Sequence, residues 1–120
     1  ELELKNKPGN YFAGQITGVE GYLESASMGL LASLSATAKI LGKDYIPPPR
    51  DTALGALINY LTDSSRKNFQ PMNINFGLFC GPDMKIRNKQ LRNQNIAKNA
   101  LQQLQKWRYE SKDCMKSYVF

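Results

Sequence analysis

Three glycines, Gly14, Gly18 and Gly21, lie within eight residues, between a short apolar run at 11–13 and a long segment with helical periodicity. We interpret the run as a short buried strand. A strand that leads through a glycine loop into a helix is the arrangement that commonly holds flavin and nucleotide cofactors. A tight strand-to-helix turn is the alternative explanation of the same glycines. Their spacing is not the GxGxxG of dinucleotide folds, so the sequence leaves both a cofactor site and a tight turn open.

The second half of this loop matches the capping box, in which a Ser or Thr and a Glu three residues later bond each other's amides. Thr17 is the expected cap and Glu20 its partner, so the helix is predicted to begin at Gly18. Gly42, with lysines beside it, indicates where the helix ends. Apolar residues at helical spacing predict its buried stripe: Leu23, Ala26, Leu30, Leu34, Ala38 and Leu41.

Small residues form the other stripe of this helix, so another backbone, a sheet or a flat ligand can approach it closely. They are Ser25, Gly29, Ala32, Ser33 and Ala36. Two carboxylates, Glu20 and Glu24, lie near the helix start. They are either an acid/base pair or residues that cap the helix and favour its dipole.

The rest of the chain predicts two more helices and a strand. After a stiff proline-rich connector at 45–50, Asp51 or Thr52 can cap a second helix. Residues 69–79 alternate apolar side chains with asparagines, which is a strand period. A third helix is predicted from Lys85 to Glu110. The expected buried residues of the two helices are Leu54, Leu57, Ile58, Leu61, Ala97, Ala100, Leu101, Leu104 and Trp107.

Composition narrows the classes of function. The chain has 120 residues and a formal charge of +6, and its acidic residues are thinnest between Asp83 and Glu110. That bias favours a polyanionic partner, although a solvated basic helix explains it too. There is no His, and Cys80 and Cys114 form no CxxC pair, so the usual zinc ligands and the usual general base are missing. No segment reads as a signal peptide or a bilayer span, which makes the cytoplasm the expected location.

The chain begins with Glu1 in an alternating run typical of the middle of a sheet, so we expect a piece of a longer protein. If the glycine loop holds a cofactor, the first-turn amides of Gly18 and Val19 would favour an oxygen of negative character. Gly18 and Gly21 have no side chains, so they would let a ligand come close to the backbone of the loop. Gln15 and Thr17 would add polar contacts, and Tyr22 a ring.

Three blocks resemble the C-terminal part of the folate- and FAD-dependent tRNA (uracil-5-)-methyltransferases, the Gid or TrmFO family. They are YFAGQITGVEGYLESASMGLLA at 11–32, PPPRDTALGALINYLTD at 47–63 and RKNFQPMNINFGLF at 66–79. The GidA or MnmG flavoproteins, which modify the wobble uridine of tRNA, carry a similar first block, but typically with Asn-Gly-Thr-Thr-Gly at 17–21. The Val19-Glu20 pair and the later FQPMNINFGL favour the methyltransferase.

The resemblance implies transfer of a one-carbon unit from methylenetetrahydrofolate to C5 of a uridine, in the tRNA T-loop or in ribosomal RNA, with FAD and NAD(P)H. It implies that the first block lies beside the flavin, through Gly14, Gln15, Ile16, Thr17, Gly18, Val19, Glu20, Gly21 and Tyr22. RNA or folate contacts are expected at Arg50, Arg66, Lys67, Arg92, Lys98 and Lys106. The family's nucleophilic cysteine and its glycine fingerprint for FAD have no counterpart in this chain. Cys80 does not match that cysteine, because it stands where family members often have proline. We expect no catalytic residue and no metal in this piece.

The expected fold is α+β and mainly α, with three helices and one or two short strands. In the full-length enzyme it would be the C-terminal part of a Rossmann-like FAD-binding domain. Within 1–120 we expect a flavin-side block at 1–42, a connector with a helix and strand at 43–82, and a basic helix and tail at 83–120. The expected partners are the RNA substrate, the rest of that domain and, for the isolated piece, a second copy, but no membrane. A GidA-type flavoprotein and a non-catalytic RNA-binding helical module are the alternatives.

Overall fold

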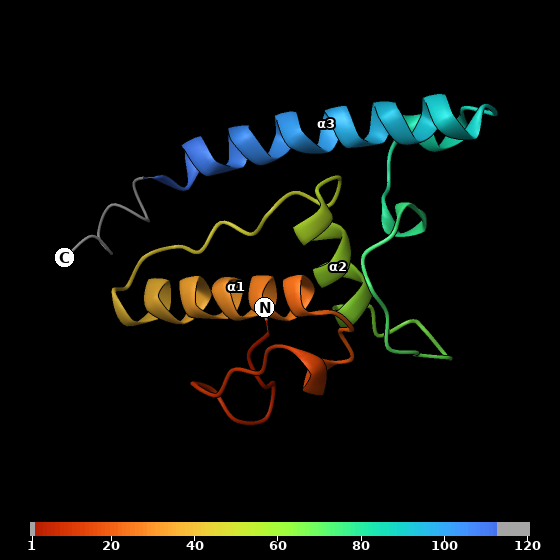
Figure 1. Cartoon of the computed structure of the whole chain (residues 1–120). Coiled ribbons are helices and arrows are strands. Elements are labelled where there is room, and N and C mark those ends of the chain that lie inside the picture. The colour runs from red at the N-terminus through yellow and green to blue at the C-terminus, as the bar shows by residue number, and fades with distance from the viewer. Residues whose placement is uncertain (1, 113–120) are drawn as a thin grey trace.

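The computed structural model describes residues 2–112 and is mainly helical, as expected (Figure 1). Three α-helices and three short 3₁₀ helices follow one another along the chain. They are η1 (Gln15–Thr17), α1 (Tyr22–Ile40), α2 (Ala53–Thr62), η2 (Phe76–Leu78), η3 (Pro82–Lys85) and α3 (Lys89–Glu110). The prediction of three helices in a mainly α fold is confirmed.

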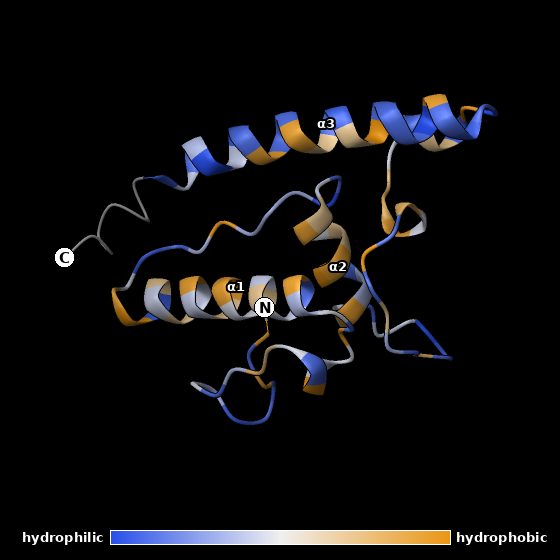
Figure 2. Ribbon diagram, viewed as in Figure 1, coloured by the Kyte–Doolittle hydropathy of each residue, from blue (hydrophilic) through white to orange (hydrophobic). Residues whose placement is uncertain are grey.

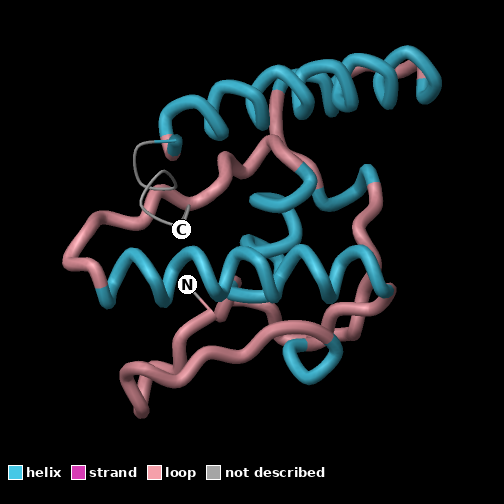
Figure 3. The backbone as a smooth tube through the Cα atoms, turned by 60° about the vertical axis from the view of Figure 1, so that its left-hand side comes forward, coloured by secondary structure: helices cyan, strands magenta, loops and turns pink. Residues whose placement is uncertain are grey.

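Residues 43–52, which include the proline-rich connector, run between the two long helices, α1 and α3, and lead into α2 (Figures 1 and 3). The glycine loop lies on the other side of α1, below it in Figure 1. One core cluster joins the loop to the three helices, with Val19 of the loop, Met28 and Leu31 of α1, Leu57 and Ile58 of α2, and Trp107 of α3. The connector is tied to this body through its backbone, since the Trp107 ring donates to the Ile46 carbonyl oxygen.

The two segments that were expected to be strands, 11–13 and 69–79, form only isolated bridges, and the end of the second is the 3₁₀ helix η2. Tyr11 pairs with Glu3 in an antiparallel bridge, and Met72 pairs with Val19 in a parallel one. The alternation of the later segment is still visible, since Met72 and Ile74 are half-buried and Asn73 is exposed. Neither segment has a further strand beside it in the described chain, so the alternation produces no sheet.

The capping-box prediction is wrong. Helix α1 begins at Tyr22 with Gly21 as its N-cap and no side-chain cap. Thr17 is instead the last residue of η1, where its hydroxyl donates to the carbonyl oxygen of Gly14 at 2.6 Å. Gly18 takes a left-handed conformation and Val19 is fully buried. Burial of Val19 in the core thus outweighs the local cap and delays the helix by four residues.

The predicted buried stripe of α1 is also largely wrong. Leu23 and Leu30 are 82% and 57% exposed, although Ala38 is buried as expected. The core lies on a neighbouring face of the helix, which overlaps the predicted stripe at Ala38 and packs with α2 and Trp107. Its buried residues are Met28, Leu31, Ala32, Ser35 and Ala38.

The predicted end of α1 is confirmed. The Gly42 amide donates to the Lys39 carbonyl oxygen at 3.2 Å, and the Lys43 amide donates to the Ala38 carbonyl oxygen at 2.9 Å, which is the Schellman arrangement. Lys39 also forms an ion pair with Glu3 and lowers the pKa of that carboxyl. The pair ties the start of the chain to the last turn of α1.

Helix α2 is capped as predicted, since the Thr52 hydroxyl accepts a hydrogen bond from the Gly55 amide at 3.1 Å. A Cβ atom on Gly55 would lie 1.9 Å from the Pro49 carbonyl oxygen. The connector therefore passes directly over the first turn of α2. Leu57 and Ile58, two of the predicted core residues of α2, are buried.

Helix α3 ends where predicted but begins later, at Lys89, with the Asn88 side chain as its cap. Its buried residues are Ile96, Ala100 and Trp107, and the Trp107 ring donates from Nε1 to the Ile46 carbonyl oxygen at 2.8 Å. The predicted burial of Ala97 and Leu101 is wrong, because both face solvent. Figure 2 shows α3 as largely hydrophilic, in contrast to α1.

Candidate functional site at the start of helix α1

The glycine loop is closed by its own backbone. The Thr17 amide donates to the Gly14 carbonyl oxygen at 2.9 Å, and the Gly18 amide donates to the Gln15 carbonyl oxygen at 3.0 Å. These bonds form η1 and leave the Gly18 amide satisfied. The expectation that this amide is free to bind a ligand is therefore wrong.

Gly18 and Gly21 both have positive φ angles, +91° and +95°, which residues other than glycine rarely adopt. A Cβ atom on Gly18 would lie 2.3 Å from the ring of Phe69. At Gly21 it would lie 2.2 Å from the Glu24 carboxylate and 2.8 Å from the Asn73 amide nitrogen. On the side where a Cβ atom would lie, the space beside both glycines is occupied by other residues of the chain.

The end of the loop is bonded to the extended segment that follows α2. The Met72 amide donates to the Gly18 carbonyl oxygen at 3.0 Å, and the Glu20 amide donates to the Met72 carbonyl oxygen at 3.1 Å. The Asn73 side chain then donates to the Glu20 carbonyl oxygen at 3.1 Å. Residues far apart in the sequence thus fix the position of the first turn of α1.

The part of the loop that remains open to solvent is smaller than predicted. Tyr22 is 97% exposed and Ile16 is 74% exposed, whereas Val19 is fully buried and cannot touch a ligand. An open pocket of about 290 Å³ lies here, lined by Gln15, Gly21, Tyr22 and Ser25. No side chain caps α1, whose N-cap Gly21 and first residue Tyr22 line this pocket. Uncapped first-turn amides favour an oxygen with negative character.

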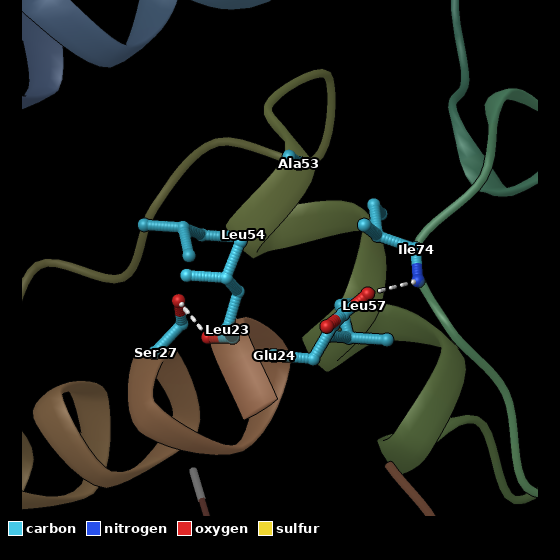
Figure 4. Close-up of a pocket in the computed structure, with 7 residues that line it drawn as sticks. All are labelled: Leu23, Glu24, Ser27, Ala53, Leu54, Leu57 and Ile74. Atoms are coloured by element: carbon cyan, nitrogen blue, oxygen red, sulfur yellow. Dashed lines mark hydrogen bonds between the residues drawn. The ribbon is translucent and has the colours of Figure 1, made fainter. Parts of the chain in front are cut away.

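A second, more apolar groove of about 120 Å³ lies between α1, α2 and the extended segment (Figure 4). In Figure 4 the side chains of Leu23 and Leu54 project toward one another at its edge. A Glu24 carboxylate oxygen accepts a hydrogen bond from the Ile74 amide at the other edge. The groove is lined by Leu23, Glu24, Ser27, Ala53, Leu54, Leu57 and Ile74.

Comparison with known proteins identifies relatives over most of the chain. It is 54% identical over 104 residues to the methylenetetrahydrofolate–tRNA-(uracil-5-)-methyltransferase TrmFO of Acetivibrio thermocellus, which is 87% of this chain and 24% of that relative. Identity to the protein of the same name is 49% over 108 residues in Novosphingobium aromaticivorans (89% and 24%) and 46% over 103 residues in Bacillus subtilis (86% and 24%).

Over most of its own length, the chain matches one part of the TrmFO proteins. It spans about a quarter of the length of the curated relatives that it matches. The family model for glucose inhibited division protein A matches residues 1–44, which contain the glycine loop and α1. The match to the TrmFO proteins extends much further, so the methyltransferase resemblance seen in the sequence is confirmed and the GidA-type alternative is not favoured.

The six basic residues expected to contact RNA or folate do not form one site. Arg66 and Lys67 lie in the loop after α2, away from Arg92, Lys98 and Lys106 on α3 (Figure 1). Arg50 and Lys67 are exposed, as are Lys98 and Lys106. Lys106 lies 3.9 Å from Glu110 in a surface ion pair. The basic residues after α2 and those on α3 therefore lie on separate parts of the molecule.

Arg66 has a structural role. Its guanidinium lies 4.4 Å from the centre of the Tyr60 ring, and its Nε lies 3.4 Å from the Asp63 carboxylate. The hydroxyl and amide of Ser65 donate to Asp63 and lower the pKa of its carboxyl, with smaller contributions from the charges of Arg66 and Arg50. These contacts close the turn after α2.

Sequence reasoning missed the residues that hold the loop from outside, namely Phe69, Met72 and Asn73. They lie about fifty residues from the glycines, in the predicted strand, and the only signal was its alternation. Cys80 is exposed and free, and Cys114 lies outside the described residues. Within 2–112, no three potential metal ligands cluster, and no helix is long and apolar enough to cross a membrane.

Proposed function

We propose that this chain is one part of an enzyme that methylates C5 of a uridine in tRNA, with methylenetetrahydrofolate as the carbon donor, FAD as a bound cofactor and NAD(P)H as the reductant. The names of relatives that are 46–54% identical over most of the chain support the activity and the tRNA and folate substrates. The proposal includes a cytoplasmic location. It also includes the division into a flavin-side block at 1–42, a connecting part at 43–82 and a basic helix with its tail at 83–120.

The observation that carries the cofactor assignment is the uncapped start of α1 beside an open pocket. Gln15, Gly21 and Tyr22 line that pocket and are the residues of this chain that we expect to hold the flavin. The first-turn amides of α1 stabilise a negative charge placed there by about 0.3 to 2 kcal/mol. When bound, the flavin supplies the redox chemistry of the one-carbon transfer.

The nine residues assigned to the flavin side from the sequence divide into two groups in this proposal. Gln15, Ile16, Gly21 and Tyr22 are accessible at the pocket or beside it. The other five shape the loop: Gly14, Thr17, Gly18, Val19 and Glu20. We expect substitutions in the second group to act on the flavin only through the fold.

The basic surfaces are proposed to contact the RNA backbone or the glutamate tail of folate. Lys98 on α3 and Lys67 after α2 are exposed and have no ion pair within residues 2–112. Arg66 is held by Tyr60 and Asp63, so its contribution would be smaller. The catalytic nucleophile is proposed to come from the part of the enzyme that this chain does not contain.

The cofactor assignment is tested with a chimera in which this chain replaces the matching quarter of the Acetivibrio thermocellus relative. Tyr22→Ser removes a ring that is 97% exposed, so it leaves the fold intact and should reduce the bound flavin measured by absorbance. Tyr109→Ser is the matched control, because Tyr109 is 78% exposed on α3. Full flavin occupancy in the Tyr22→Ser chimera would contradict the assignment.

The RNA contacts are tested by measuring tRNA binding to the same chimera over a range of salt concentrations. Neutralising one phosphate-binding lysine should reduce the slope of log K against log salt by about one unit. We expect that change for Lys98→Ala and a smaller one for Lys106→Ala, whose ammonium is already paired with Glu110. An unchanged slope for Lys98→Ala would remove α3 from the RNA surface.

A further inference from the structure

One face of α1 is exposed and uncharged along nearly the whole helix. We call it the outer face, and it consists of Leu23, Ala26, Gly29, Leu30, Ser33 and Ile40. Leu23 and Ile40 are each 82% exposed and Leu30 is 57% exposed. These residues lie within about 120° of one another around a helix of 3.6 residues per turn. The outer face is therefore one uncharged strip along the helix, and its large apolar members are Leu23, Leu30 and Ile40.

The outer face differs from the exposed surface of α3. Five exposed residues of α3 are charged: Lys89, Lys98, Lys106, Arg108 and Glu110. On α1 the exposed charge is that of Lys39, which is paired with Glu3 and lies outside the strip. A helix face that stays in water normally carries charged or polar residues, as α3 does. The outer face instead has the composition of a covered surface, and without cations it offers nothing to an RNA phosphate.

The apolar groove of about 120 Å³ continues this face toward α2, because Leu23 belongs to both. Apolar cavities of about 150 Å³ hold a molecule the size of benzene, so the groove suits one aliphatic or aromatic side chain. Leu54, Leu57 and Ile74 supply its apolar walls (Figure 4). An occupant that places one apolar side chain here can cover Leu23 and Leu30 with the residues that flank it.

We propose that the outer face and the groove are the surface on which the remainder of a TrmFO-type chain packs, with an uncharged segment of aliphatic residues. This inference rests on the proposed function, which makes the chain one part of a longer enzyme. Its specific support is that the chain spans 24% of the length of its relative, so about three quarters of such a protein is available to cover the face. The segment covers Leu30 at the centre and fills the groove beside Leu23.

The test measures how fast a thiol placed on the outer face reacts with a maleimide reagent. Leu30→Cys is the probe, and Leu101→Cys on α3 is the matched control, because these leucines are 57% and 63% exposed in this chain. Each substitution is made in the 120-residue chain and in the chimera with the Acetivibrio thermocellus relative. Labelling is followed on the substituted peptide by mass spectrometry, so that other cysteines do not interfere.

In the 120-residue chain we expect similar labelling rates for the two probes. In the chimera, the Leu30→Cys thiol should react at least about tenfold more slowly, since it becomes accessible only when the structure opens locally, while the Leu101→Cys thiol is unchanged. Equal rates in a folded chimera would overturn the proposal. Protection of Leu30→Cys in the 120-residue chain that grows with concentration would also overturn it, because a second copy would then cover the face.

If the chimera does not fold, the same two probes are placed at the aligned positions of the full-length Acetivibrio thermocellus relative, where the same difference is expected and its absence has the same meaning. The outcome is separable from that of the proposed function. A protected thiol in a protein that binds no flavin and methylates no tRNA supports the docking surface and refutes the function. An accessible thiol in a yellow, active protein does the opposite.

Discussion

Glu24 in the first turn of α1 accepts a hydrogen bond from the backbone amide of Ile74, at 3.2 Å and fifty residues further along the chain. The bond joins the start of the helix to the extended segment after α2, next to the bond from Asn73 to the Glu20 carbonyl oxygen. Glu24 holds a backbone segment in place with its carboxylate, whereas Glu20 contributes its backbone carbonyl oxygen to the neighbouring bond.

Replacing Glu24 with alanine should destabilise the chain by about 1 to 3 kcal/mol, because the Ile74 amide loses a charged acceptor. Glu24→Gln keeps an acceptor oxygen and should cost less. Urea unfolding followed by circular dichroism measures both, and amide exchange at Ile74 should accelerate in Glu24→Ala. The control is Glu110→Ala, which removes a surface ion pair at 3.9 Å and should change stability by less than about 1 kcal/mol. Equal effects of the two alanine variants would contradict the role of Glu24.

Alanine substitutions at Gly18 and Gly29 should change the stability of the fold in opposite directions. Gly18→Ala combines a φ of +91° with a clash against the Phe69 ring, so we expect a loss of about 1 to 3 kcal/mol. Gly29 is helical with nothing within 4 Å of its Cβ position, so Gly29→Ala should stabilise by about 0.5 to 1 kcal/mol. Thermal unfolding measures both changes.

The same two variants show whether the strain at Gly18 comes from its ring contact. Gly18→Ala combined with Phe69→Leu should recover part of the loss, because the smaller side chain can move away from the new methyl group. A double variant whose loss is the sum of the two single losses would place the strain in the backbone alone.

The sequence predicted the elements well where a local signal decided them. Thr52 caps α2 and Gly42 ends α1 as their residue types require, since each bond closes within one helical turn. The start of α1 was wrong because burial of Val19, through contacts far along the chain, overrode a good local cap. Periodicity predicted an amphipathic α1, but it placed the exposed Leu23 in the buried stripe and left the buried Met28 out of it.

The glycines mark a loop, and the structure has an open pocket beside it that is lined by Gln15, Gly21 and Tyr22 of the predicted set. No local pattern says that Phe69 fills the space beside Gly18, because that contact depends on how α2 turns the chain back. The division of the loop into exposed and supporting residues therefore required the structure.

Trp107 joins α3 to the rest of the molecule and should be the most sensitive position on that helix. Its ring is 7% exposed, packs in the core and donates to the Ile46 carbonyl oxygen. Trp107→Phe should lose about 1 to 3 kcal/mol from the missing hydrogen bond and the smaller ring. Urea unfolding followed by circular dichroism measures the loss. Tyr109→Phe, two residues away and 78% exposed, is the control and should be nearly neutral.

Asp63, in the turn after α2, should make the stability of the fold depend on pH in the acid range. The two hydrogen bonds from Ser65 lower the pKa of Asp63 below its ordinary value of 3.8. A carboxyl whose pKa is lower in the folded state stabilises the fold above its unfolded pKa, and that contribution is lost as the pH falls through the folded pKa. The loss attributed to Asp63 is therefore confined to pH values below about 4.

Ser65→Ala removes the side-chain hydrogen bond, which is the largest cause of the shift, and should move the pKa of Asp63 back toward 3.8. An NMR titration of the Asp63 carboxyl carbon measures the pKa directly. Ser64→Ala changes the neighbouring exposed hydroxyl and should leave the titration where it is. If Ser65→Ala and Ser64→Ala titrate alike, the low pKa arises from the backbone amide of residue 65 or from the charges of Arg66 and Arg50. Raising the salt concentration separates these two causes, because it screens the surface charges and should shift the pKa upward only if they dominate.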